Sequence, residues 1–201
     1  MGKITEDDIR QSVADAIQYI SYYHPEDFVK GMVEAYEKEK SVAAKNAIGQ
    51  ILINSKMCAM GHRPLCQDTG SINVFVKVGL NANLEITKEL NDIINEGVAL
   101  GYKDPINTLR YSIVSDPAGK RVNTKDNTPA VIHVSVNNGD TIDITVAAKG
   151  GGSENKSKFA VLNPSDSIYD WVMENARNMG AGWCPPGIIG IGIGGNPEKS
   201  M

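Results

Sequence analysis

The stretch SINVFVKVG, residues 71–79, decides the fold class of this 201-residue chain. Its β-branched and aromatic residues alternate in part with polar ones, which predicts a strand. Upstream of it, apolar residues recur at helical spacing, so we expect helices over residues 1–60. Thr5 and Ser41 are suited to cap two of these helices, and Pro25 to begin another. The predicted strand therefore marks the change from a helical segment to a mixed one.

Downstream of this strand, helices and strands are interleaved. A helix capped by Thr87 is expected to end near Gly101, and two strand patterns, residues 131–136 and 141–146, flank the tetrapeptide NNGD (137–140). Because Asn-Gly between alternating runs is typical of a tight turn, we expect these two strands to form an antiparallel hairpin. A further helix, capped by Ser165 or Asp166, is predicted to run to about Met179, and a short apolar strand is predicted over residues 188–193. Helices followed by a mixed sheet with at least one antiparallel hairpin indicate an α+β fold.

Composition excludes several classes of protein. The chain is 41% hydrophobic and carries a net charge of −4 with its basic residues scattered, so we expect no nucleic-acid partner. No apolar run approaches the roughly 18 residues of a membrane span, and the first residues are polar and acidic, so we expect no membrane attachment and no secretory signal. Three cysteines are too few for a disulfide framework, which favours a reducing, cytoplasmic location.

The end of the sequence suggests that the domain is incomplete. Asn196 and Pro197 have the residue types of a helix N-cap and a first helical position, yet the chain stops at Met201. A native terminus seldom falls one turn into a capped helix. We therefore expect residues 1–201 to form one incomplete domain of a longer protein, helical over residues 1–60 and α+β over residues 61–201.

Polar and sulfur-bearing side chains gather in RPLCQDTG, residues 63–70. Cys66, Gln67 and Asp68 lie in a segment that has no apolar periodicity. A thiolate can bind soft or borderline metals, and a carboxylate can transfer a proton. The alternative is an Asp-Thr-Gly turn in which Cys66 packs as a small hydrophobe.

A glycine-rich segment, AKGGGSENK (148–156), follows a predicted strand. Glycines such as Gly152 let the backbone bring its N–H groups close to an anion, and Asn155 and Lys156 add side-chain donors. The Gly-Lys-Ser/Thr ending of a nucleotide-binding P-loop is missing. The alternative is a flexible surface loop.

Two more cysteines differ in context. Cys184 precedes two prolines in GWCPPG (182–187), which predicts a rigid, extended segment suited to a metal ligand. The alternative for this segment is a structural loop around a packed tryptophan. Cys58 lies among core residues of a predicted helix, and we expect it to pack rather than to bind metal. No CxxC pair is present, so a structural zinc site is poorly supported.

Two further features have weaker implications. Residues 190–195, GIGIGG, match the dinucleotide fingerprint G-x-G-x-x-G, but the βαβ unit and the acidic residue that should follow are absent. Arg110 is suited to bind a carboxylate with two parallel hydrogen bonds. The alternative for Arg110 is an ordinary surface arginine.

Taken together, these segments resemble the class I, iron–sulfur fumarate hydratase family, which also includes L-tartrate dehydratase. The resemblance is to the N-terminal part of the family and runs nearly end to end. The resembling stretches, in family order, are GHRPLCQDTG (61–70), NTLRYS (107–112), NTKDNTP (123–129), AKGGGSENK (148–156), WCPP (183–186) and IIGIGIGGNPEK (188–199).

The resemblance implies a [4Fe–4S] cluster held by three cysteines. Two of them are Cys66 and Cys184, and the third belongs to a segment beyond Met201; Cys58 matches no ligand position. It also implies a set of substrate-binding residues, with Asp68 taking part in proton transfer while the principal base lies in a C-terminal domain that is absent here. The substrate-binding set is Gln67, Asp68, Arg110, Gly152, Asn155 and Lys156.

The function that follows is hydration of fumarate to (S)-malate and its reverse, a step of the tricarboxylic acid cycle. The chain would be the N-terminal part of that lyase, inactive by itself, and would work with a C-terminal domain or partner subunit in a homodimeric enzyme. An L-tartrate or mesaconate-type dehydratase subunit is the alternative within the same class. Two alternatives lie outside the lyase class: a non-catalytic module that binds anions or nucleotides, and an assembly domain that docks on a catalytic partner.

Overall fold

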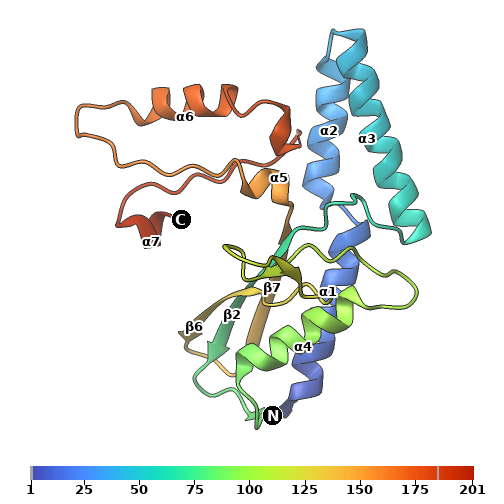
Figure 1. Cartoon of the computed structure of the whole chain (residues 1–201), viewed down its shortest axis with the longest axis vertical. Coiled ribbons are helices and arrows are strands. Elements are labelled where there is room, and N and C mark those ends of the chain that lie inside the picture. The colour runs from blue at the N-terminus through green and yellow to red at the C-terminus, as the bar shows by residue number, and fades with distance from the viewer. Residues whose placement is uncertain (1, 185) are drawn as a thin grey trace. The chain divides into compact units, whose positions relative to one another are not determined.

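The computed structural model describes residues 2–184 and 186–201 (Figure 1). The chain divides into two compact units, Met1–Lys149 and Gly150–Met201.

Helices dominate the start of the first unit, as predicted. Their bounds are α1 Glu6–Tyr22, α2 Glu26–Lys38 and α3 Val42–Gly61. Thr5 caps α1 in a capping box with Asp8, and the Ser41 hydroxyl accepts a hydrogen bond from the backbone N–H of Ala44. Pro25 precedes the first residue of α2. These ends were predictable because capping depends on residues close in sequence.

The central sheet has three strands in the order β6-β2-β7. Strand β2 (Ser71–Gly79) is parallel to β6 (Val131–Asn137) and antiparallel to β7 (Ile142–Lys149). Two short pairs complete the strands of this unit: β1 (Ile4–Thr5) with β3 (Leu84–Glu85), parallel, and β4 (Val114–Ser115) with β5 (Val122–Asn123), antiparallel. The α+β fold class is therefore confirmed.

The predicted hairpin between residues 131–136 and 141–146 is wrong. These strands run in opposite directions, but β2 lies between them and pairs with both. The side chains of Ile72, Val74 and Val76 are at most 1% exposed. The central position in the sheet therefore gives β2 the largest stabilisation from buried apolar surface. The NNGD turn instead spans the end of β2, where Gly79 N–H donates to the carbonyl of Thr141. Strands β4 and β5 form an antiparallel hairpin in the described part of the chain.

One hydrophobic core joins the sheet to two helices. Helices α1 and α4 (Leu90–Tyr102) lie together against one face of the sheet (Figure 1). The buried core consists of Ile9, Val13, Ile17, Ile72, Val74, Val76, Ile93, Ile94, Val98, Tyr102 and Leu109. On β2 the buried residues alternate with exposed ones such as Phe75, whose ring stacks on His133 at a centroid distance of 5.0 Å. This alternation is what the sequence of β2 predicted.

Helices α1 and α4 approach closely at Gly97. A Cβ atom there would lie 2.6 Å from the carbonyl oxygen of Arg10 and 2.8 Å from Cβ of Val13. We expect Gly97→Ala to lower the free energy of unfolding by about 1–3 kcal/mol, the usual cost of overpacking a core. Gly31→Ala is the matched control, because Gly31 lies within α2 and a Cβ there meets nothing within 4 Å.

Urea unfolding of the two variants tests this. Gly31→Ala should raise the free energy of unfolding by about 0.5–1 kcal/mol, since alanine is the better helix former. Equal changes in the two variants would contradict the close packing of α1 on α4.

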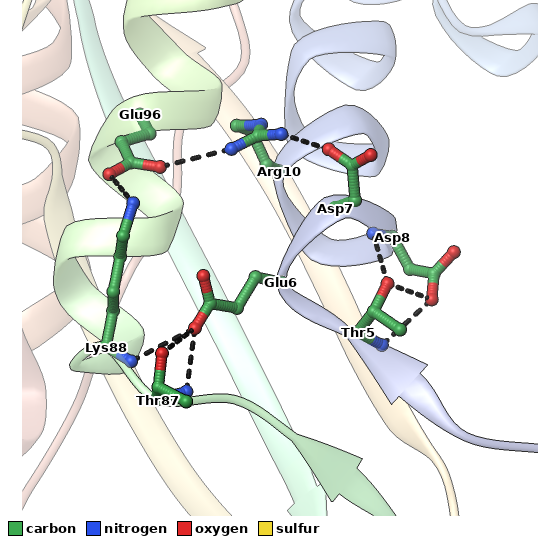
Figure 2. A network of polar contacts seen from close by, with 8 residues as sticks. All are labelled: Thr5, Glu6, Asp7, Asp8, Arg10, Thr87, Lys88 and Glu96. Atoms are coloured by element: carbon green, nitrogen blue, oxygen red, sulfur yellow. Dashed lines mark hydrogen bonds and ion pairs between the residues drawn. The ribbon is translucent and has the colours of Figure 1, made fainter.

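A polar network ties the start of α1 to the start of α4 (Figure 2). The Glu6 carboxylate accepts hydrogen bonds from the N–H and hydroxyl of Thr87, at 2.7 and 2.8 Å, and from the N–H of Lys88 at 3.1 Å. These bonds, led by that from the Thr87 N–H, lower the pKa of Glu6 from its ordinary 4.5 to about 2. Glu96 of α4 binds both Lys88, at 2.5 Å, and Arg10, at 3.4 Å.

This network explains why Thr87 does not cap α4, contrary to the prediction. The Thr87 side chain and N–H are already bound to Glu6, and the helix begins two residues later than expected, with Glu89 as its N-cap. The partner lies 81 residues away in the chain, so local sequence carries no sign of it.

Replacing Glu6 by glutamine is expected to lower the urea midpoint at pH 7 and to flatten its decline in acid. Because the folded-state pKa of Glu6 lies below its ordinary value, its contribution is complete above about pH 4.5 and is lost as pH falls toward 2. The midpoints of wild type and variant should converge at about pH 2. Glu34→Gln, an exposed α2 carboxylate paired with Lys38 one turn away, is the control and should change the midpoint little at any pH. Parallel pH profiles for wild type and Glu6→Gln would contradict the assignment.

The second unit consists of short helices joined by extended segments. Its elements are α5 Gly151–Glu154, α6 Ile168–Arg177, the 3-10 turn η1 Ala181–Trp183 and α7 Pro197–Ser200. The prediction for α7 is confirmed, because the Asn196 side chain caps it and Pro197 is its first residue. Helix α6 is capped by Ser167 rather than by Ser165 or Asp166, and the Asp166 carboxylate instead accepts from Asn163.

The prediction of a strand over residues 188–193 is wrong, because the described structure has no strand there. This segment has no ladder partner among the described residues of its unit, and Ile188 and Ile193 are 80% and 67% exposed. Gly192 lies against the carbonyl of Ser200 at the end of α7, where a Cβ would collide. An apolar run alone cannot form a strand without a neighbour that takes up its backbone hydrogen bonds.

None of the helices in the described part of the chain combines the length and hydropathy needed to cross a membrane.

Candidate active site

Residues 62–70 form a loop that is fixed to the helices on both of its sides. His62 ends α3 in a left-handed conformation, with φ of 47°. The N–H of Leu65 donates to the carbonyl of Ser21 in α1 at 2.8 Å, and its carbonyl accepts from Asn54 of α3 at 3.0 Å. Cys66, next in the chain, is exposed. The alternative in which Cys66 packs as a small hydrophobe is therefore wrong.

The next residues of the loop form a turn. The N–H of Gly70 donates to Oδ1 of Asp68 at 3.2 Å, which orients the carboxylate, and Gly70 has a φ of 70° that favours glycine. Asp68 is half-buried and Gln67 is exposed. The loop therefore presents a thiol, an amide and a carboxylate in three consecutive residues.

Cys58 lies beneath this loop and has a different character. It is 5% exposed, and its Sγ lies 3.5 Å from the carbonyl oxygen of Pro64 and 3.6 Å from Oδ1 of Asn54. Burial raises the pKa of the Cys58 thiol, which disfavours the thiolate that binds metals. The expectation that Cys58 packs is confirmed.

The segment that carries Arg110 is tied to the same loop. The Thr69 hydroxyl donates to the carbonyl of Arg110 at 2.5 Å, and the Tyr102 hydroxyl donates to the carbonyl of Thr69 at 3.0 Å. The guanidinium of Arg110 is exposed and forms no hydrogen bond or ion pair with any residue in 2–184 or 186–201. The first unit thus brings the Asp68 loop and Arg110 together, and Arg110 keeps its donors for a ligand.

In the second unit the glycine-rich segment contacts the Cys184 segment. A Cβ on Gly152 would lie 2.8 Å from the carbonyl oxygen of Gly182 and 3.2 Å from Sγ of Cys184. The Ser153 hydroxyl donates to the carbonyl of Trp183 at 3.1 Å. A Cβ on Gly182 would lie 3.1 Å from Cε of Lys156 and 3.7 Å from its ammonium nitrogen. Gly152, Lys156 and Cys184 are therefore neighbours.

The backbone of this second group differs from the prediction in two ways. Residues 151–154 form a helical turn, α5, rather than an irregular loop, and Asn155 ends it with an exposed side chain. Cys184 was expected in an extended conformation but has φ 58° and ψ 59°, because its N–H closes the turn η1 by donating to Ala181. Pro185 lies outside the described residues. The Cys184 thiol is exposed and lies next to Gly152, which has no side chain. Its Sγ is therefore accessible to a soft metal.

The predicted residues thus fall into two groups, one in each unit. The first unit holds Cys66, Gln67, Asp68 and Arg110, and the second holds Gly152, Asn155, Lys156 and Cys184. Within the described residues no three His, Cys, Asp or Glu side chains are grouped as ligands of one metal ion. Thr69, which bridges to Arg110, was missed, although its place beside Asp68 in the motif was a usable signal.

Sheet register adds a relation that local sequence does not show. Ser71 at the start of β2 pairs with Lys149 at the end of β7, and β6 starts beside Asn73. The chain therefore enters β2, enters β6 and leaves β7 at one end of the sheet. The loops that adjoin this end are those with the candidate residues 66–70 and the segment before β6.

Residues 10–201 match the model of the family described as fumarate hydratase (Fumerase). The chain belongs to this family. The family expected from the motifs is therefore confirmed.

Curated proteins similar to this chain are named as subunits of a second enzyme, L(+)-tartrate dehydratase. The chain is 34% identical over 199 residues to the putative L(+)-tartrate dehydratase subunit alpha of Methanocaldococcus jannaschii, which covers 96% of this chain and 69% of that protein. It is 30% identical over 206 residues to the L(+)-tartrate dehydratase subunit alpha of Escherichia coli K12, covering 100% of this chain and 65% of the relative. The chain spans about two thirds of the length of these curated relatives.

Proposed function

We propose that this chain is the N-terminal part, or alpha-type subunit, of an iron–sulfur hydro-lyase that acts on a small dicarboxylate in the cytoplasm. The observation that carries the proposal is the place of Gly152 beside the exposed thiol of Cys184, with the Lys156 side chain next to the neighbouring Gly182. A backbone turn and an ammonium group beside a soft metal ligand suit a negatively charged substrate that is bound next to a metal. Membership of the fumarate hydratase family supports the same reaction class.

Cys66 and Cys184 would hold the [4Fe–4S] cluster, with a third cysteine from outside residues 1–201. Both are free, exposed thiols, whereas Cys58 is buried and its thiol pKa is raised. Bound there, the cluster would supply a Lewis-acidic iron that polarises the departing hydroxyl.

The other residues would bind and orient the substrate. Arg110, whose guanidinium forms no hydrogen bond or ion pair with a described residue, binds one carboxylate through two parallel hydrogen bonds. Lys156, Asn155 and the backbone N–H groups around Gly152 stabilise the second carboxylate as negative charge builds up on it. Gln67 donates to a substrate oxygen, and Asp68 takes part in proton transfer.

The proposed substrate pair is fumarate and (S)-malate. L-tartrate is the second candidate, because the named relatives are tartrate dehydratase alpha subunits. Mesaconate differs from fumarate by one methyl group. We further propose that the chain requires a C-terminal domain or partner subunit and that the complete enzyme is a homodimer.

Substrate profiling of the complete enzyme, purified without oxygen, tests the proposal. The expected result is a brown protein whose kcat/KM is highest for fumarate and malate among fumarate, L-tartrate and mesaconate. A higher value for tartrate would replace the substrate and keep the reaction class. A colourless protein that turns over none of the three and binds nucleotide would overturn the proposal in favour of a non-catalytic module. The 201-residue chain assayed alone should hydrate no fumarate.

A further inference from the structure

Two segments that are distant in sequence carry the candidate residues of the first unit. Asp68 lies before β2, and Arg110 lies between α4 and β4. The Thr69 hydroxyl donates to the Arg110 carbonyl, and the Arg63 guanidinium donates to the Ile106 carbonyl at 3.4 Å. Both of these hydrogen bonds are exposed to water, so a buried connection would hold the two segments in register more firmly.

Asn127 supplies this buried connection. Its Oδ1 accepts hydrogen bonds from the N–H groups of Ser112 and Ile113, at 2.7 and 3.2 Å. Its Nδ2 donates to the carbonyl of Gly70 at 3.0 Å. One amide therefore binds the residues that follow Arg110 with its acceptor and the residue that ends the Asp68 turn with its donor.

The environment of Asn127 makes these bonds specific. The residue is 0% exposed, so each group it binds would lose its partner without access to water if the side chain were removed. Its φ of 61° lies in the left-handed region, which Asn tolerates better than most residues. Aspartate has nearly the same shape as Asn but has no N–H to donate.

The backbone around Asn127 is itself anchored. Asp126 accepts from the N–H and hydroxyl of Thr128, and the N–H of Ala130 donates to Asn95 of α4 at 2.8 Å. The side chain of Asn127 therefore extends from a fixed loop toward the two candidate segments. Its role cannot be reduced to closing its own turn, because all three of its bonds reach residues at least 14 positions away.

We propose that Asn127 is a positioning residue that sets the Asp68 turn and the Arg110 segment relative to each other. The effect of Asn127 on catalysis rests on the proposed function. The acceptor side acts on the Arg110 segment and hence on substrate binding. The donor side acts on the Asp68 turn and hence on proton transfer.

Kinetics of the complete enzyme separate the two sides. Asn127→Asp keeps the acceptor and loses the donor, so kcat should fall about tenfold while KM stays within about twofold. Asn127→Ala loses both, so kcat should fall and KM should rise, each by about tenfold. The matched control is Asn107→Ala, since Asn107 is 5% exposed and its amide donates to Gln18 and Ser21 of α1. This control should lower the unfolding midpoint and leave kcat and KM within about twofold.

Amide hydrogen exchange on the 201-residue chain tests the inference without any turnover. The amides of Ser112 and Ile113 should exchange at least about tenfold faster in Asn127→Ala than in wild type, and should stay protected in Asn127→Asp and Asn107→Ala. If wild type turns over no dicarboxylate, the proposed function fails, and these exchange rates alone decide the present inference. If Asn127→Ala does not fold, the kcat-specific loss in Asn127→Asp remains the deciding result. Unchanged exchange in Asn127→Ala, or equal kinetic effects in the Asn127 and Asn107 variants, would overturn it.

Discussion

Replacing Cys184 by alanine is expected to lower turnover of the complete enzyme by at least about a hundredfold. Mutating a residue that only hydrogen-bonds to a metal ligand already lowers activity by up to about a hundredfold. The Cys184 thiol is exposed and lies beside Gly152, where a Cβ would approach Sγ to 3.2 Å. The sulfur forms no hydrogen bond with a side chain among the described residues and is exposed, so its loss should show as lost metal rather than lost packing. The protein should be purified without oxygen and examined for iron, sulfide and visible absorbance before the assay.

Cys58→Ala is the matched control for this experiment. Cys58 is buried, and its Sγ lies near backbone and side-chain oxygens of its own unit. Its removal should lower the free energy of unfolding by about 1 kcal/mol, as a typical point mutation does, and leave the iron content unchanged. Retention of iron and activity in Cys184→Ala, or loss of both in Cys58→Ala, would show that the cysteines have been assigned to the wrong roles.

Replacing Arg110 by alanine is expected to reduce kcat/KM for the dicarboxylate by about 10²–10³, or about 2.7–4 kcal/mol, because a hydrogen-bonded charge pair with one substrate carboxylate is lost. The guanidinium is exposed and forms no hydrogen bond or ion pair with a described residue, so its removal breaks no such bond within the described part of the protein. The backbone carbonyl that accepts from Thr69 remains in the variant. The loss should therefore appear in kinetics and not in the unfolding midpoint.

Two further variants sharpen the test of Arg110. Arg110→Lys should recover only a small part of the activity, because an ammonium group cannot offer two parallel N–H donors to a carboxylate. Arg121→Ala is the control, since that side chain donates to the carbonyl of Pro117 within the β4–β5 hairpin. Full activity in Arg110→Lys would mean that charge alone suffices, and a threefold or smaller loss in Arg110→Ala would remove Arg110 from the site.

Sequence predicted best what depends on neighbours in the chain. The caps at Thr5, Ser41 and Asn196 were predictable because each side chain binds an N–H three residues on. The cap predicted at Thr87 was wrong because Glu6, 81 residues earlier in the chain, accepts hydrogen bonds from its N–H and hydroxyl. The strand predicted over residues 188–193 needs a pairing partner, which no local pattern supplies.

The sheet and the site show the same limit. Asn-Gly at 138–139 correctly indicated a turn, but which strand fills the space between β6 and β7 is decided by the burial of β2. Cys66 and Cys58 could be separated by their sequence contexts, and the structure agrees with that separation. Asn127 was quoted in a motif but assigned no role, because its function depends on two segments that meet it only in the folded chain.

The central place of β2 has a consequence for synthesis on the ribosome. Translation delivers β2 well before either of its neighbours, and its ladder cannot close until Lys149 has emerged. Until β6 emerges, a nascent chain carries this apolar strand with both edges open, and one edge stays open until β7 follows. Chaperones shield segments of this kind. Translation arrested between β2 and β6 should therefore yield a chaperone-bound nascent chain, and arrest beyond β7 a protease-resistant one.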